Sequence, residues 1–203
     1  MHEFGSAWIC STVTLLVLAI TIGRVATKRW AGVLIDGRGR YSLTHFQTVT
    51  WTLAILSAYV ATVVSSSFAP TNLSIDTSLL QLMGIAAGSA VLATGVKGVK
   101  DAPGSGAGKI AMEGETITRP DTTTTKITAK LSQIWLEEEG SLADMVVSIT
   151  KFQNFVFTLV ALGVFIALAT KAQKLPALPE TLVWLLGISH AGYVGGKVPD
   201  RPK

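Results

Sequence analysis

Residues 46–65, FQTVTWTLAILSAYVATVVS, form a run without a single Asp, Glu, Lys or Arg. A helix of about 20 residues rises about 30 Å, which matches the hydrocarbon core of a bilayer. Four similar apolar runs accompany it, at residues 8–23, 79–96, 152–170 and 178–196. The sequence therefore predicts an all-α membrane protein with five spans.

The composition agrees with a membrane environment. Hydrophobic residues make up 49% of the chain and charged residues only 15%, and the mean hydropathy is +0.48. Charged residues account for about 25% of an average soluble domain. Cys10 is the only cysteine, which excludes an intrachain disulfide and a cysteine-based zinc cluster.

The first and last runs need arguments of their own. Residues 8–23 lack a basic segment before them and are followed by basic residues within 24–29, so we expect a retained anchor and not a cleaved signal peptide. Residues 181–196 alone would rise only about 24 Å. We therefore expect the last span to begin near Leu178.

The basic residues predict an orientation. Of the 17 Lys and Arg residues, all but Lys171 and Lys174 fall in the connections 24–45 and 97–151 and in the tail 197–203, which five spans in series place on one side. Basic residues beside spans are retained in the cytoplasm. We expect the N-terminus outside and the C-terminus in the cytoplasm.

Two segments of the chain resemble one another. Residues 42–53 and 148–159 share six of twelve residues at an offset of 106, and residues 79–88 resemble 182–191 at an offset of 103. Each copy contains two spans, so the copies point the same way across the bilayer. Such parallel repeats predict a pseudo-two-fold axis along the membrane normal.

This repeat divides the chain into four parts. We expect an N-terminal transmembrane anchor at 1–30, a first helix-pair repeat at 31–98, a cytoplasmic linker at 99–147, and a second repeat with a basic tail at 148–203. The fold class predicted is an N-terminal anchor helix plus two parallel repeats of a transmembrane helix pair.

The twin pattern S-L/I-T-x-F-Q-x-x-x-W/F-T, with G-I-S-x-A-G-Y-x-G-G-K closing the second copy, resembles a group of uncharacterised bacterial multi-pass membrane proteins. The resemblance covers about residues 35–198. It implies the fold and a location in the bacterial inner membrane, but no activity and no functional residue.

Polar residues at the start of each repeat have two interpretations. Thr44 with Gln47, and Thr150 with Gln153, fit the capping box, in which the Thr side chain caps the helix and the Gln side chain reaches back to it. Alternatively, Gln47 and Gln153 line a polar vestibule. The spacing favours capping.

Small residues recur four apart in the second span of each repeat. Such faces let helix backbones approach closely in lipid, and we expect them to pack helices within the chain or between copies. Residues 191–196, AGYVGG, lack the Thr-Val start of a potassium filter, so packing is the preferred interpretation. The predicted packing residues are Gly84, Gly88, Gly187, Ala191, Gly192 and Gly196.

His190 is a titratable side chain well inside a predicted span. An ionisable residue at that depth is a candidate for a proton path or a metal site. Its counterpart in the first repeat is Ala87, and no carboxylate lies near it along the span, which favours a neutral His that donates across a helix interface.

The linker offers two candidate contacts. Residues 130–139 are expected to form a short interfacial helix with Leu131, Ile134 and Trp135 toward the lipid headgroups. The acidic residues 137–139 are a candidate docking point for a cytoplasmic partner. Residues 101–109 have Pro103 where a phosphate-binding loop needs Gly, which excludes that motif.

These patterns predict no enzyme and no cofactor. The sequence has no nucleophile set, metal-ligand cluster or cofactor fingerprint, and its basic residues lie at span ends without interleaved aromatics, which argues against nucleic acid. We expect a non-catalytic scaffold or anchoring subunit, as a homo-oligomer or with other membrane subunits. The alternative is an ion-conducting pore lined by His190, Gln47 and Gln153.

Overall fold

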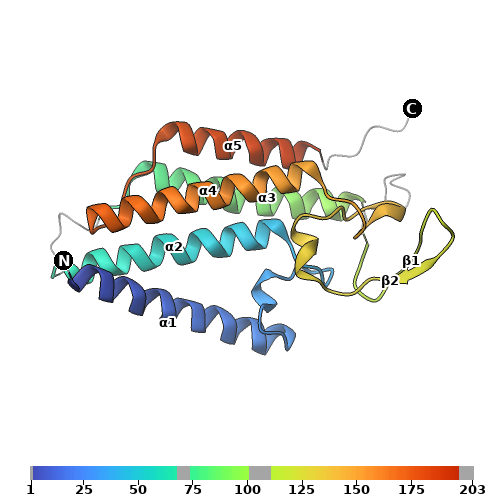
Figure 1. Cartoon of the computed structure of the whole chain (residues 1–203), viewed down its shortest axis with the longest axis horizontal. Helices are drawn as coiled ribbons and strands as arrows, with labels where there is room; N and C mark the ends of the chain where they lie inside the picture. The colour runs from blue at the N-terminus through green and yellow to red at the C-terminus, as the bar shows by residue number, and fades with distance from the viewer. Residues whose placement is uncertain (1, 68–73, 101–110, 197–203) are drawn as a thin grey trace.

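The computed structural model describes residues 2–67, 74–100 and 111–196. The described residues form five α-helices that lie side by side and alternate in direction (Figure 1). The helices are α1 (His2–Thr27), α2 (Leu43–Ser65), α3 (Thr77–Lys100), α4 (Ile149–Ala172) and α5 (Glu180–Gly195). Because the directions alternate, α1, α3 and α5 end where α2 and α4 begin.

Four helices, α1 to α4, are long and apolar enough to cross a membrane. This confirms a helical, multi-pass membrane protein at the level of helix length and composition. Helix α5 has 16 residues, which rise about 24 Å. It is shorter than a bilayer core of about 30 Å, so the fifth span stays a prediction.

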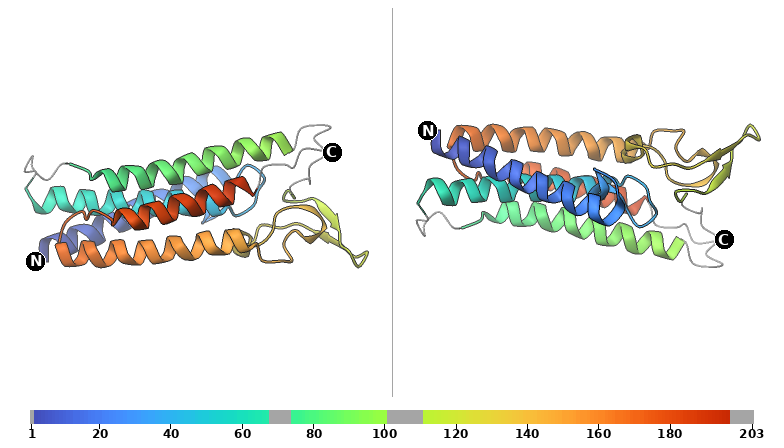
Figure 2. Two further views of the ribbon diagram at one scale, coloured as in Figure 1. Left: turned by 90° about the horizontal axis from the view of Figure 1, so that it is seen from above. Right: turned by 90° about the horizontal axis from the view of Figure 1, so that it is seen from below.

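The arrangement of the helices differs from a two-fold pair of hairpins. Helices α2, α3, α5 and α4 form a ring in that order, and α1 lies outside it against α2 (Figure 2). The ring makes neighbours of α2 and α4, which run in the same direction, and of α3 and α5. A two-fold axis along the helices would place the members of each such pair across the axis. The predicted pseudo-two-fold axis is therefore not confirmed, and the two hairpins lie side by side.

The middle of the ring is filled by apolar side chains. The Trp51 ring meets the Phe165 ring edge-on, with their centroids 6.2 Å apart and their planes at 90°. Both side chains are buried, as is Ile55 one turn beyond Trp51. Small residues such as Ala58 and Ala161, which are also fully buried, let the helices approach around these rings.

Helix α1 is held to α2 by hydrogen bonds as well as by packing. The Trp8 indole Nε1 donates to the Ser57 hydroxyl at 3.0 Å, and the Ser11 hydroxyl donates to the Ser57 carbonyl at 2.9 Å. After α1 the chain turns back and passes close to it, so that an added Cβ on Gly32 would overlap the Gly23 carbonyl oxygen. Only glycine fits that approach.

Residues 28–42 and 111–148, which we call the end cap, cover the end of the bundle where α2 and α4 begin. Strands β1 (Thr116–Thr118) and β2 (Thr124–Lys126) pair antiparallel, with Ile117 opposite Thr125. Three 3₁₀ turns complete the cap: η1 (Gly32–Leu34), η3 (Leu131–Ile134) and η4 (Gly140–Leu142). The described part of the predicted linker is thus folded onto the bundle.

The interfacial helix predicted at 130–139 does not form. Its residues make the single 3₁₀ turn η3, and Ile134 is buried against Leu43 and Tyr193. Trp135 packs on Phe155 with ring centroids 5.6 Å apart. The prediction was wrong because an apolar stripe of this length is satisfied equally well by protein and by lipid.

Candidate functional site

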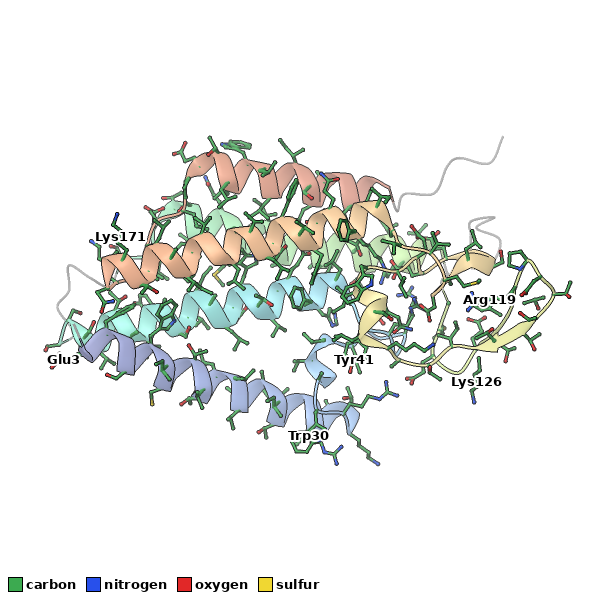
Figure 3. All side chains as sticks on the ribbon, in the orientation of Figure 1. Glu3, Trp30, Tyr41, Arg119, Lys126 and Lys171 are labelled. Atoms are coloured by element: carbon green, nitrogen blue, oxygen red, sulfur yellow. The ribbon has the colours of Figure 1, made fainter. Side chains whose placement is uncertain are left out.

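Charged side chains are concentrated in the end cap. In Figure 3 the helices carry mostly carbon along their length, whereas nitrogen and oxygen atoms gather between the ends of α2 and α4 and the β-hairpin. Six of these side chains form what we call the ion cluster: Asp36, Arg40, Lys97, Glu138, Asp144 and Lys151. Three of them are basic and three are acidic, so the formal charges of the cluster balance.

Two lysines reach from the helices into the cap. Lys97, in the last turn of α3, lies 3.0 Å from Asp36 and 3.0 Å from Glu138. Lys151, in the first turn of α4, lies 3.6 Å from Glu138 and donates to the Leu136 carbonyl at 2.8 Å. Both lysines and Glu138 are buried, and buried charges are stable only when they are paired. Glu138 therefore ties α3 and α4 to the cap.

A second ion pair joins the two segments of the cap. The Arg40 guanidinium donates to Asp144 at 2.7 Å, and both side chains are buried. The Gln133 amide donates to the other Asp144 oxygen at 2.9 Å. Its carbonyl oxygen accepts from the backbone N–H groups of Tyr41 and Lys130, each at 3.2 Å. This one buried amide satisfies groups from both cap segments.

The sequence Asp36-Gly-Arg-Gly-Arg40 forms the turn that presents Asp36. The Asp36 carboxylate accepts the backbone N–H groups of Arg38 at 3.0 Å and Arg40 at 3.3 Å, and Gly39 supplies a positive φ of 75°. Burial by itself raises the pKa of Asp36, but the Lys97 ammonium and these N–H groups outweigh it. The net result is a pKa below the usual value.

The lowered pKa of Asp36 predicts acid destabilisation of the end cap. A carboxyl whose folded pKa lies below its unfolded value of about 3.9 stabilises the fold above that pH, and the stabilisation is lost as pH falls through the folded pKa. We expect the thermal midpoint of unfolding to decrease when the pH is lowered below about 4. Thermal denaturation of Asp36→Asn, compared with wild type across pH, isolates this carboxyl. An equal acid response in the variant would assign the effect to other groups.

A polar cluster joins α2 to α4 inside the bundle. The Gln47 amide donates to the Asn154 side-chain oxygen at 3.1 Å and to the Thr158 hydroxyl at 2.8 Å. All three side chains are fully buried. Such bonds hold helices together in lipid. Gln153, the repeat counterpart of Gln47, is exposed on the outer side of α4.

The capping boxes predicted at Thr44 and Thr150 do not form. Helices α2 and α4 begin earlier, with Ser42 and Ser148 as the N-cap residues, and neither serine side chain makes a capping hydrogen bond. Thr44 lies in the first turn, where its hydroxyl pairs with that of Ser42 at 2.9 Å. The helix starts were misplaced by two residues, because Ser as well as Thr is a favoured N-cap residue.

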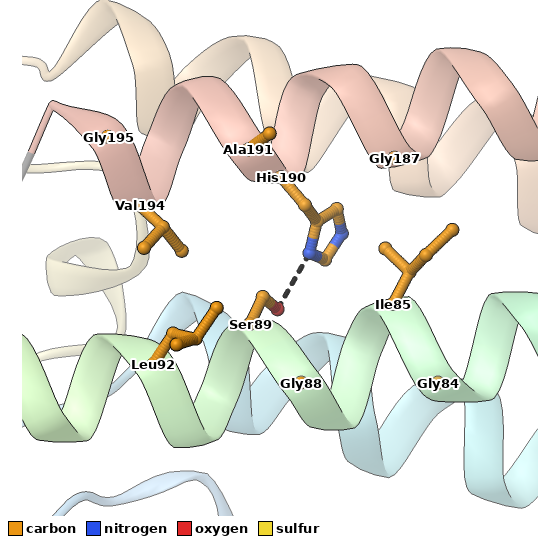
Figure 4. Close-up of a pocket in the computed structure, with 10 residues that line it drawn as sticks. All are labelled: Gly84, Ile85, Gly88, Ser89, Leu92, Gly187, His190, Ala191, Val194 and Gly195. Atoms are coloured by element: carbon orange, nitrogen blue, oxygen red, sulfur yellow. Dashed lines mark hydrogen bonds between the residues drawn. The ribbon is translucent and has the colours of Figure 1, made fainter.

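His190 is buried between α3 and α5. Its Nδ1 lies 2.7 Å from the Ser89 hydroxyl oxygen (Figure 4). The bond crosses the interface between two helices, which agrees with the expected interhelical role. Gln47 lies instead between α2 and α4, and Gln153 faces outward. The structure therefore does not bring His190, Gln47 and Gln153 together.

The six small residues predicted to pack helices behave differently from one another. Gly187 faces Ile85 of α3, with an added Cβ 3.4 Å from its Cδ1 atom. At Gly84, Gly88 and Gly192 an added Cβ would meet no atom within 4 Å, and at Gly196 the nearest contact is the backbone oxygen of Gly192. Gly84, Gly88, Gly187 and Ala191 instead line a groove between α3 and α5.

Sequence reasoning missed the contributions of Asn154 and Thr158. A usable signal was present, because Lys151, Asn154 and Thr158 lie three and four residues apart and so form one polar stripe on an otherwise apolar helix. Among the residues that the structure describes, no group of three His, Cys, Asp or Glu side chains is placed to hold a metal ion.

The candidate site consists of the ion cluster, which holds the end cap to the bundle, and of polar contacts that join one helix to the next. No family model, curated protein or solved structure matches this chain.

Proposed function

We propose that this chain is a non-catalytic membrane anchor that carries its end cap as a rigid docking platform for other subunits of a bacterial inner-membrane assembly. The observation that carries the proposal is the pairing of Lys97 and Lys151 with Glu138. These contacts make the cap a fixed extension of α3 and α4.

A rigid platform is distinguished from a flexible tether by its buried charge. A flexible tether would leave its charged side chains in water, where they carry no desolvation penalty. Here Arg40 and Asp144 are buried together at 2.7 Å, and the desolvation of such a pair is offset only while its geometry is kept. A cap held in one geometry presents the same surface to each partner.

The bundle interior favours anchoring over conduction. Trp51, Ile55 and Phe165 fill the ring on the side of Gln47 that faces away from the end cap, and all three are buried. An ion path needs polar groups or water along its length. The side chains considered for a pore, His190 and Gln47, belong to two different helix interfaces.

Two measurements test the proposal. Purified protein in liposomes is expected to give no ion flux, and selective conductance that disappears in His190→Ala would favour the pore instead. Wild-type protein taken from its native membrane is expected to retain a partner that Glu138→Ala loses. The same partner retained by both proteins would place the docking surface outside the end cap.

The proposed orientation can be tested by labelling single cysteines. With Cys10→Ser as the background, Thr123→Cys lies in the turn between β1 and β2, and Lys174→Cys follows α4 at the opposite end of the bundle. A membrane-impermeant maleimide is expected to label position 174 in intact cells, and position 123 only after permeabilisation. The reverse pattern would invert the topology, and labelling of both in intact cells would contradict an odd number of crossings between them.

A further inference from the structure

The groove between α3 and α5 lies on the side of the bundle away from α1 (Figures 1 and 4). Its volume is about 470 Å³. Past Gly84 and Ile85 it continues into a second hollow of about 380 Å³ beside Trp184. The space beside Gly84 and Gly88 is empty, since an added Cβ at either position would meet no atom within 4 Å. Ligand pockets commonly measure about 300–1,000 Å³.

One polar side chain in the groove has an unused hydrogen-bonding atom. His190 is only 3% exposed, and its Nδ1 pairs with the Ser89 hydroxyl at 2.7 Å. The Ser89 hydroxyl has a single proton, which it donates to the Ala86 carbonyl at 3.0 Å. We assign the proton of the bond between His190 and Ser89 to Nδ1, because the Ser89 proton is placed on the Ala86 carbonyl. That leaves Nε2 as an acceptor with no donor among the described residues.

The surroundings define the chemistry of a suitable donor. The lining of the groove contains glycines and apolar side chains and no charged residue. The nearest lysine along α3 is Lys97, eight residues from Ser89, or about 12 Å along a helix. Among the described residues, an anionic headgroup would find no cation at that depth. A neutral, largely apolar molecule with one hydroxyl group fits both the lining and the Nε2 acceptor.

We propose that this groove binds a neutral lipid alcohol, whose hydroxyl donates to Nε2 of His190 while its hydrocarbon lies over Gly84 and Gly88. Trp184 borders the second hollow and is 69% exposed. The second hollow is therefore open to receive the rest of the lipid's hydrocarbon. The proposal does not depend on the anchoring role of the end cap.

The test uses two probes that differ in one hydrogen-bond donor. The protein is placed in phosphatidylcholine nanodiscs that contain either 1,2-dioleoylglycerol or its 3-O-methyl ether, and native mass spectrometry counts the molecules retained. We expect wild type to retain the alcohol about tenfold better than the ether, which corresponds to one neutral hydrogen bond. Equal retention of the two probes would overturn the proposal without any variant.

Variants separate the groove from the rest of the surface. His190→Phe is expected to retain alcohol and ether equally, and Gly88→Leu, which fills the groove, to retain neither. The matched control is Gly163→Leu, at an exposed position of α4 where an added Cβ also meets no atom within 4 Å. It is expected to behave as wild type. Alcohol retention unchanged in Gly88→Leu would overturn the proposal.

The same spectra reveal a protein occupant. If a second copy filled the groove, Gly88→Leu would convert a dimer to a monomer and neither probe would be retained by wild type, which contradicts lipid binding. Nitrogen-15 labelling of the three histidines gives an independent readout in folded wild-type protein. Dioleoylglycerol, but not its ether, is expected to shift the Nε2 resonance of His190, and an unchanged resonance would contradict the proposed contact.

Discussion

Replacement of Glu138 by alanine is expected to lower the free energy of unfolding by about 3–5 kcal/mol, the usual cost of breaking a buried ion pair from one side. The loss removes the carboxylate that lies 3.6 Å from Lys151 and one of the two carboxylates that pair with Lys97. Lys151 is the more affected, because it lies in the first turn of α4, where the helix dipole disfavours a positive charge. Thermal denaturation in lipid measures the change.

Two comparisons make this result specific. Glu139→Ala removes the next carboxylate in the chain, which is only half-buried, and a smaller loss is expected. Glu138→Ala combined with Lys151→Met removes the stranded ammonium as well, and stability is expected to recover in part. The single variant should also expose residues 111–148 to trypsin. A change in stability under about 0.5 kcal/mol in Glu138→Ala would show that the ion cluster does not hold the cap.

Replacement of Trp51 by alanine is expected to cost a similar amount, about 3–5 kcal/mol, through a cavity in the middle of the ring. Trp51 is 1% exposed and meets Phe165 edge-on, so its removal strips contacts from two helices at once. The free energy lost is that of van der Waals packing around Trp51, because lipid solvates an apolar side chain as well as protein does. The thermal midpoint of unfolding reports the loss.

Trp184→Ala provides the control of equal size. Trp184 is 69% exposed on α5, and its truncation is expected to change stability little. Trp51→Phe keeps most of the ring volume and is expected to lie between wild type and Trp51→Ala. Equal effects of Trp51→Ala and Trp184→Ala would contradict the placement of the bundle core.

The long helices were predictable because the bilayer sets their length. The uncharged run at residues 46–65 lies within α2, and the runs at 8–23, 79–96 and 152–170 each lie within one of the other long helices. The boundaries were less accurate, since α1 extends back to His2 and α3 on to Lys100. Polar residues continue a helix beyond the apolar run whenever water or the end cap satisfies their side chains.

The ion cluster could not be predicted from the positions of its members. Lys97 and Lys151 were counted as basic residues at span ends, which is what sequence alone supports. Their partner Glu138 belongs to a segment whose path depends on the turns η3 and η4 and on the bridge between Leu136 and Val147. Pairings of this kind are decided by tertiary structure, for which a sequence has no local signal.

The sequence repeat did not predict the surroundings of equivalent residues. Gln47 and Gln153 occupy equivalent positions in the sequence, yet only Gln47 faces another helix, and it meets Asn154. Helices α2 and α4 are neighbours that use different faces against each other. Side chains at equivalent positions of α2 and α4 therefore cannot both point into the bundle. Sequence similarity between the two repeats thus does not imply similar surroundings.

Lys97 has a different role at each stage of the protein's life. On the proposed topology it emerges from the ribosome before its partner Glu138, which follows 41 residues later. At about 5–20 residues per second that gap lasts roughly 2–8 s. During this interval Lys97 lacks its Glu138 partner, and on the proposed topology its charge would retain the end of α3 in the cytoplasm. Once Glu138 arrives, Lys97 lies buried between Asp36 and Glu138, so on the proposed topology a residue that directs insertion would later hold the end cap to α3.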